Sequence, residues 1–143
     1  MDLKYLLEFL EKFEIRDEVI GDFVKGKKVL ERNKNVFIVP EEFDENQIYG
    51  DKMIFIKLKD KTLPSRYLIN MIAVNGKVLE ILSESKALDF TYGKDLDLNN
   101  VKNLELVEGK YYPVVFEDEV LGYAEYSRNK LRNKFNIGEY LKE

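Results

Sequence analysis

Val120-Leu121-Gly122-Tyr123-Ala124 is the stretch that decides the fold, together with Pro113-Val114-Val115-Phe116 and the acidic turn Glu117-Asp118-Glu119 that lead into it. Short apolar runs rich in β-branched and aromatic residues are typical of strands, and turn-forming residues separate them. Further short runs of this kind lie between Phe90 and Val107. Several short strands linked by tight turns predict a small β-barrel or sandwich in this part of the chain.

A cationic segment follows these strands directly. Residues 127–134 contain four cations and no acid, in a chain whose net charge is -4; the cations are Arg128, Lys130, Arg132 and Lys134. Dense cations are the footprint of a phosphate-binding surface. Side chains alternate along a strand, so an extended segment would place all four on one face, and a helix would spread them. An RNA-binding role therefore favours an extended conformation, and the alternative is a solvated surface loop.

Two missing residue types exclude much chemistry. The 143 residues include no His and no Cys, so imidazole and thiolate metal ligands, disulfides, and Ser-His-Asp or Cys-His nucleophile systems are impossible. The glycine patterns of phosphate-binding loops are also missing. Carboxylates, Lys, Tyr and hydroxyls remain for acid–base work. We expect a protein that is not an enzyme, with no catalytic residues, no metal and no cofactor.

The composition indicates a folded protein. Hydrophobic residues make up 45% and charged residues 35%, which is enough for a packed core. No apolar run approaches the roughly 20 residues that cross a bilayer, and charged residues interrupt the apolar ones at the N-terminus. We expect a soluble monomer without a membrane partner, in the cytoplasm, or in the nucleolus if the host has a nucleus.

The N-terminal part of the sequence predicts a mixture of helices and strands. The expected elements are a helix over 2–14 with Asp2 as N-cap, a hairpin of strands 28–31 and 36–39, a strand over 53–59, a helix over 62–75, and a strand over 78–82. Pro64 near the start of the second helix and Gly76 just past its end fit the properties of these residues. The stretch 83–86 is the most linker-like in the chain. We therefore expect an α+β protein with an N-terminal α/β domain over 1–86 and a C-terminal β-barrel or sandwich over 87–143.

Three motifs of the C-terminal part resemble the PUA domain, an RNA-binding pseudo-barrel. Phe90-Thr91-Tyr92-Gly93-Lys94-Asp95-Leu96 is similar to its opening motif, and Asn100-Val101 stands where a Gly-apolar pair is usual. Val120 to Ala124 resembles its apolar-Gly-aromatic strand. The ending Asn136-Ile137-Gly138-Glu139-Tyr140-Leu141 resembles one PUA family in particular, the large-subunit ribosome-biogenesis factors of the "nuclear import protein seven" group and their archaeal relatives.

That family places an α/β domain before the PUA domain, and residues 36–43 are also similar to its N-terminal domain. The chain is shorter than expected for the family between Ala124 and Ile137, where a further strand normally lies. Either residues 133–137 supply a minimal strand or the barrel closes imperfectly.

The resemblance implies a non-catalytic protein that binds precursor ribosomal RNA or another single strand and works with ribosome-assembly proteins. Its RNA-binding residues would be the four cations together with Tyr92, Gly93 and Lys94. The alternatives are a protein-interaction adaptor with little RNA affinity of its own, or the RNA-binding subunit of an RNA-modifying system.

Aromatic rings and further charged stretches are also candidates for the binding surface. Tyr92, Tyr111 and Tyr112 could stack bases, although most aromatics fill cores. The cluster 25–28 with Arg32 and Lys34 could extend an RNA path, or it could be a charged hairpin edge that prevents aggregation. The carboxylates of 41–42 and 117–119 fall at expected turns, where solvation is the better explanation.

Overall fold

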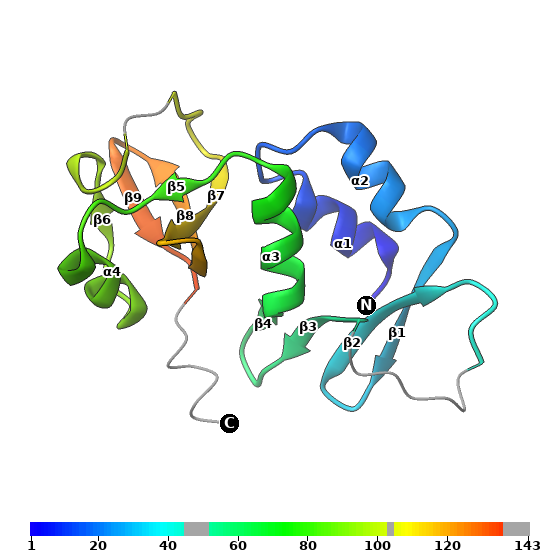
Figure 1. Cartoon of the computed structure of the whole chain (residues 1–143). Coiled ribbons are helices and arrows are strands. Elements are labelled where there is room, and N and C mark those ends of the chain that lie inside the picture. The colour runs from blue at the N-terminus through cyan, green and yellow to red at the C-terminus, as the bar shows by residue number, and fades with distance from the viewer. Residues whose placement is uncertain (45–51, 103–104, 136–143) are drawn as a thin grey trace. The chain divides into compact units, whose positions relative to one another are not determined.

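The structure is a computed structural model that describes residues 1–44, 52–102 and 105–135 (Figure 1). Its helices and sheets confirm the expected α+β class. The chain divides into two compact units. The first unit contains Met1–Glu11 and Ile15–Asn75. The second contains Lys12–Glu14 and the described residues from Gly76 onward.

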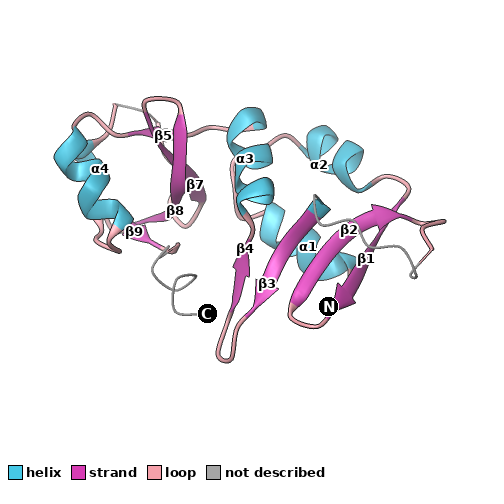
Figure 2. Ribbon diagram, turned by 60° about the horizontal axis from the view of Figure 1, so that its bottom comes forward, coloured by secondary structure: helices cyan, strands magenta, loops and turns pink. Residues whose placement is uncertain are grey.

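Within its described residues, the first unit combines three α-helices with an antiparallel sheet of order β1-β2-β3-β4 (Figure 2). Its elements are α1 (Leu3–Leu10), α2 (Asp17–Val24), β1 (Lys27–Arg32), β2 (Asn35–Pro40), β3 (Met53–Lys57), β4 (Thr62–Pro64) and α3 (Arg66–Asn75). The β1–β2 hairpin confirms the expected pairing of its two apolar runs. Strand β2 is buried from Val36 to Val39, as its unbroken apolar sequence requires.

Helix α1 confirms Asp2 as its N-cap, because the Asp2 carboxylate accepts a hydrogen bond from the Tyr5 backbone N–H at 3.2 Å. The helix ends at Leu10, four residues before the expected end. The sequence did not predict α2, which contains Gly21, a residue that is unfavourable inside a helix.

The expected helix over 62–75 begins later than predicted. Thr62–Pro64 forms β4 at the edge of the sheet, where a proline without an N–H is tolerated. Ser65 is 4% exposed and caps the helix, since its hydroxyl accepts from the Leu68 backbone N–H at 3.1 Å and donates to the Met53 carbonyl. Helix α3 therefore begins at Arg66, four residues after the predicted start, and Pro64 belongs to the strand before it.

The second unit is built on a curled sheet of order β5-β7-β8-β9-β6. Its elements are β5 (Leu79–Glu80), α4 (Glu84–Thr91), β6 (Leu96–Asp97), the 3₁₀ turn η2 (Leu98–Asn100), β7 (Tyr111–Phe116), β8 (Glu119–Ser127) and β9 (Lys130–Asn133). Strand β5 runs parallel to β7, and the other neighbours are antiparallel. Strand β9 lies in the stretch between Ala124 and Ile137, where the chain is shorter than expected for the family. Of the minimal strand expected over 133–137, residue 133 ends β9, and 136–137 lie outside the described residues. The ending over 136–141 also lies outside them.

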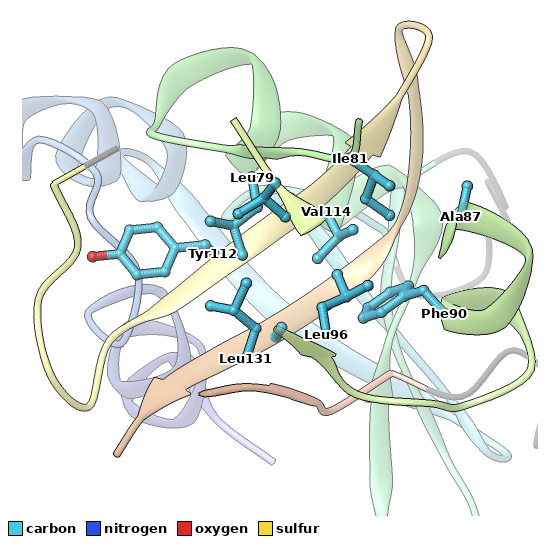
Figure 3. Packing of buried hydrophobic residues seen from close by; sticks show 10 residues of the cluster. Leu79, Ile81, Ala87, Phe90, Leu96, Tyr112, Val114 and Leu131 are labelled. Carbon is cyan, nitrogen blue, oxygen red and sulfur yellow. The ribbon is translucent and has the colours of Figure 1, made fainter. Parts of the chain in front are cut away.

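Residues 96–102 connect the two outer strands of the curled sheet, β6 and β5. They begin with β6, which pairs with β9, and further on Val101 forms an antiparallel bridge with Ile81, just after β5. The Lys102 N–H also donates to the Glu80 carbonyl at 2.8 Å. Residues 96–102 therefore continue the sheet from one edge to the other, around the cluster shown in Figure 3.

That cluster is made of fully or nearly buried side chains from every strand and from α4. It comprises Leu79, Ile81, Ala87, Phe90, Leu96, Val101, Tyr112, Val114, Ala124 and Leu131. The phenolic oxygen of Tyr112 points away from the apolar side chains (Figure 3). Burial of this apolar area at about 25 cal/mol per Å² is the main source of the unit's stability.

The expected linker over 83–86 is wrong. Ser83 is the N-cap of α4, its hydroxyl accepting from the Lys86 N–H, and Ala87 and Phe90 of that helix are buried in the cluster. The strand expected over 78–82 pairs with β7 of the second unit. The division between the units therefore falls after Asn75, before the boundary expected after Lys86.

Candidate nucleic-acid interface

The cationic run forms a hairpin and not one continuous strand. Ser127 pairs with Lys130, so Arg128 and Asn129 are the two central residues of the β8–β9 turn. Their φ angles of 52° and 61° are both positive, as in the type I′ turn favoured by two-residue hairpins. The expectation that all four cations lie along one strand is therefore wrong for Arg128.

Strand β9 does alternate as the sequence predicted. Leu131 is 0% exposed and lies in the core, whereas Lys130 and Arg132 on either side of it are exposed. Because neighbouring side chains point to opposite faces, these two cations share the outward face. Lys134 follows the strand at the same alternation and is exposed as well.

The tip of the hairpin is held by side chains from outside the turn. The Glu108 carboxylate accepts a hydrogen bond from the Arg128 backbone N–H at 2.9 Å. The Tyr126 hydroxyl donates to the Asn129 side-chain oxygen at 3.3 Å. These bonds fix the backbone under Arg128 while its guanidinium remains exposed to solvent.

Acidic side chains stand opposite the cations. Asp97 of β6 pairs in register with Lys130, and Glu125 of β8 pairs in register with Arg132. Lys134 Nζ forms an ion pair with Glu125 Oε1 at 3.4 Å. The local charge of the surface is therefore well below the +4 that the sequence alone gives.

Asn133 connects the cationic strand to the turn after α4. Its side-chain amide donates to the Phe90 carbonyl at 2.8 Å and to the Lys94 carbonyl at 3.3 Å. Its backbone N–H donates to the Asp95 carboxylate at 2.8 Å. The structure thereby brings Tyr92, Gly93 and Lys94 beside the end of β9. The sequence reading missed Asn133, because an asparagine in a charged run looks like an ordinary solvated residue.

The turn itself explains why Gly93 is a glycine. Its N–H bonds to the Phe90 carbonyl at 2.9 Å, and the Lys94 N–H bonds to the Asp89 carbonyl at 3.1 Å. These are the two bonds of a Schellman motif, in which the residue after the C-cap takes a left-handed conformation; here its φ is 95°. The C-cap residue, Tyr92, is 75% exposed and leaves its ring free of the core.

The other tyrosine candidates differ from Tyr92. Tyr112 is 0% exposed, its hydroxyl donating to the Glu14 carboxylate and accepting from the Val107 N–H, so its proposed contact with a base is wrong. Burial and the Glu14 carboxylate raise the pKa of Tyr112 well above its usual value. Tyr111 is half-buried against Phe13, with ring centroids 5.6 Å apart, and below Lys12, whose Nζ lies 5.3 Å from the ring.

The other charged stretches lie on an edge strand and in a hairpin turn. Lys27 and Lys28 lie on β1, one of the two edge strands of the first unit's sheet, and Lys28 Nζ donates to the Phe43 carbonyl at 3.3 Å. Glu117 and Asp118 form the turn of the β7–β8 hairpin, which confirms that the acidic stretch is a turn.

Within the described ranges no cluster of three or more acidic residues is placed to hold a metal ion. Among the helices described, none is long and apolar enough to span a membrane.

No model of a known protein family matches the chain, and no curated protein matches it.

Proposed function

We propose that this protein binds single-stranded RNA without catalysing a reaction, and that it serves as a factor in assembly of the large ribosomal subunit. In this proposal the second unit is a PUA-like barrel, and the first unit engages a ribosome-assembly protein. The resemblance of the 90–96 and 120–124 motifs to the PUA domain supports it, and so does the curled sheet, in which residues 96–102 pair with β9 and bridge to Ile81. The protein would act in the cytoplasm, or in the nucleolus of a host with a nucleus.

The observation that carries the proposal is the anchoring of the Tyr92–Lys94 turn to β9 by Asn133. It brings the Tyr92–Lys94 turn, in which Tyr92 is 75% exposed and Lys94 is exposed, to the end of the strand that carries Arg132. Aromatic rings stack unpaired bases and contribute about 1–3 kcal/mol per base. Cations spaced along the neighbouring strand would contact the phosphates on either side of that base.

The mechanism is positioning. Lys130, Arg132 and Lys134 would each neutralise a backbone phosphate, and Arg128 would reach from the hairpin tip. Tyr92 would then hold a base that a duplex could not present, so single strands are preferred. The acids opposite the cations lower the affinity and keep the surface from binding every polyanion.

The test is a titration of a fluorescent uridine-rich single strand with the intact chain at several salt concentrations. A variant with Arg128, Lys130, Arg132 and Lys134 changed to Ala is compared with the wild type. Each lost phosphate contact flattens the log–log salt slope by about 0.7, so we expect the variant to bind more weakly with a slope shallower by about 1.5 to 3. A matched control changes Lys25, Lys27, Lys28 and Lys34 to Ala, which removes the same charge from the first unit. Equal affinity and slope for wild type and the first variant would overturn the proposal.

The second candidate is a protein-interaction adaptor with little RNA affinity. The alternation of cations with Asp97 and Glu125 favours it, because mixed charge is common on surfaces that contact other proteins. Absence of RNA binding by both forms, with capture of a ribosome-assembly protein by the wild type, would support the adaptor.

A further inference from the structure

Glu125 occupies a central place among the cations of the second unit. It lies on β8 with Arg132 of β9 directly opposite, and its Oε1 is 3.4 Å from Lys134 Nζ. The side chain of Glu125 is 26% exposed and that of Lys134 is 40% exposed. Solvent therefore screens this pair less than a fully exposed one.

The three side chains share one face of the sheet. Residues directly opposite on antiparallel strands point to the same side, which places Glu125 with Arg132. Lys134 lies two residues beyond Arg132 and follows the same alternation. One carboxylate thus stands between two cations, and the group carries a net charge of +1 instead of +2.

We propose that Glu125 is an intramolecular competitor for phosphate that determines how strongly Arg132 and Lys134 can grip an RNA backbone. This inference rests on the proposed RNA-binding function. In the free protein the carboxylate satisfies Lys134 and faces Arg132. An RNA phosphate has to displace it, so weakly placed polyanions gain little, and a strand that also engages Tyr92 and Lys94 is selected.

The same competition affects the salt dependence. When a phosphate replaces the carboxylate beside a cation, the displaced carboxylate takes up counterions again. Fewer counterions are therefore released overall than for a cation that was unpaired. Lys134 is paired with Glu125, and Arg132 lies opposite it in register, so the wild-type slope should be shallower than four phosphate contacts would give, which is about -2.8 on a single strand.

The variant Glu125→Gln tests this, because the amide keeps the shape of the side chain and removes its charge. We expect it to bind the uridine-rich strand about twofold to fivefold more tightly than wild type at low salt, the range set by an exposed ion pair. Its slope should steepen by about 0.7 to 1.4, for one or two cations released to phosphate.

A matched control is Glu119→Gln. Glu119 lies at the other end of the same strand, beside the β7–β8 turn, and this variant changes the net charge by the same amount. The control should leave affinity and slope nearly unchanged if the effect of Glu125 is local. An equal gain from both variants would mean that net charge alone is responsible, and would overturn the inference.

Lys134→Gln provides a second measurement that does not depend on the stability of one variant. If Glu125 holds Lys134 back, this change should weaken binding more in the Glu125→Gln background than in the wild type. Equal losses in the two backgrounds would contradict the inference.

The outcomes separate the two proposals. If the wild type binds RNA and Glu125→Gln binds no more tightly, the role of Glu125 is wrong and RNA binding stands. If neither form binds, the proposed function fails, and the role of Glu125 fails with it.

Discussion

Gly122 packs directly against Phe135. A Cβ atom at Gly122 would lie 2.7 Å from Phe135 Cδ1 and 3.1 Å from its Cβ, which is closer than nonbonded carbons approach. Phe135 is 4% exposed, and its ring lies 6.0 Å from that of Tyr123, so it has little room to move. The φ of Gly122, 155°, is also one that other residues rarely adopt.

We expect Gly122→Ala to lower the free energy of unfolding by about 1–3 kcal/mol, as overpacking does in well-filled cores. Gly21→Ala is the matched control. Gly21 is exposed in α2, and nothing lies within 4 Å of the added Cβ. It should stabilise by about 0.5–1 kcal/mol, because alanine favours helix. Urea denaturation measures both, and a stable Gly122→Ala would contradict the packing.

Tyr112 gives a prediction with a defined pH dependence. Tyr112→Phe removes the donor to Glu14 and leaves the part-buried Val107 N–H without its acceptor. We expect a loss of about 1–3 kcal/mol at pH 7, with Tyr92→Phe as a neutral control at an exposed ring.

The pKa of Tyr112 is raised in the folded protein by burial and by Glu14. Its contribution is therefore fully present below the unfolded pKa of about 10 and is lost as the pH rises above it. Denaturation between pH 9 and 11 should show the advantage of wild type over Tyr112→Phe shrinking. An advantage that stays constant or grows over this range would contradict the assignment.

The two hairpins of the second unit form a natural pair of elements for comparison. Both use two-residue turns with positive φ at both central residues, Glu117-Asp118 in one and Arg128-Asn129 in the other. Neither turn contains the glycine that type I′ geometry favours. Left-handed conformations of such residues cost about 1 kcal/mol each.

Replacing each turn by Asn-Gly should therefore raise the midpoint of thermal unfolding in both cases. RNA binding should respond differently. Arg128→Asn with Asn129→Gly removes one cation and should flatten the salt slope by about 0.7, whereas Glu117→Asn with Asp118→Gly should not weaken binding. Loss of binding in both variants would show that the cation at the hairpin tip is not what matters.

The elements that the sequence predicted are those whose patterns are local. Strands β7 and β8 follow from unbroken apolar and aromatic runs, and Asp2 signals the start of α1. Helix α4 was not predicted from the sequence, because it has few buried side chains and Leu88 is exposed, so no apolar stripe indicates a helix. Ser83 followed by Glu84 was the available signal, a capping residue with an acid in the first turn.

In the candidate site too, local patterns were predicted and contacts between distant segments were not. Alternation along β9 placed Lys130 and Arg132 correctly on one face. The acids opposite them could not be foreseen, since the pairing of Asp97 with Lys130 depends on a register between segments more than thirty residues apart. Asn133 likewise acquires its role only through carbonyls of the 90–94 segment.

At the scale of the whole molecule, the path of the chain is the feature that no local pattern predicts. Residues 12–14 follow α1 of the first unit yet belong to the second. The Tyr111 N–H bonds to the Lys12 carbonyl at 2.7 Å, and Phe13 bridges in parallel to Tyr111. Glu14 pairs with Lys77 at 3.3 Å. The sequence suggested a simple order of two domains because periodicity says nothing about which sheet a connecting segment joins.

Phe13 makes this path testable. It is 2% exposed, and its ring lies 5.6 Å from those of Tyr111 and Tyr123. Phe13→Ala should cost about 3–5 kcal/mol and should raise amide exchange in β7 and β8 while leaving β2 and β3 protected. Ile38→Ala, at a position 3% exposed in β2, should show the reverse pattern. Exchange that rises equally in both units for both variants would mean that they unfold as one, because separate cooperative units confine the effect of a cavity to the unit that contains it.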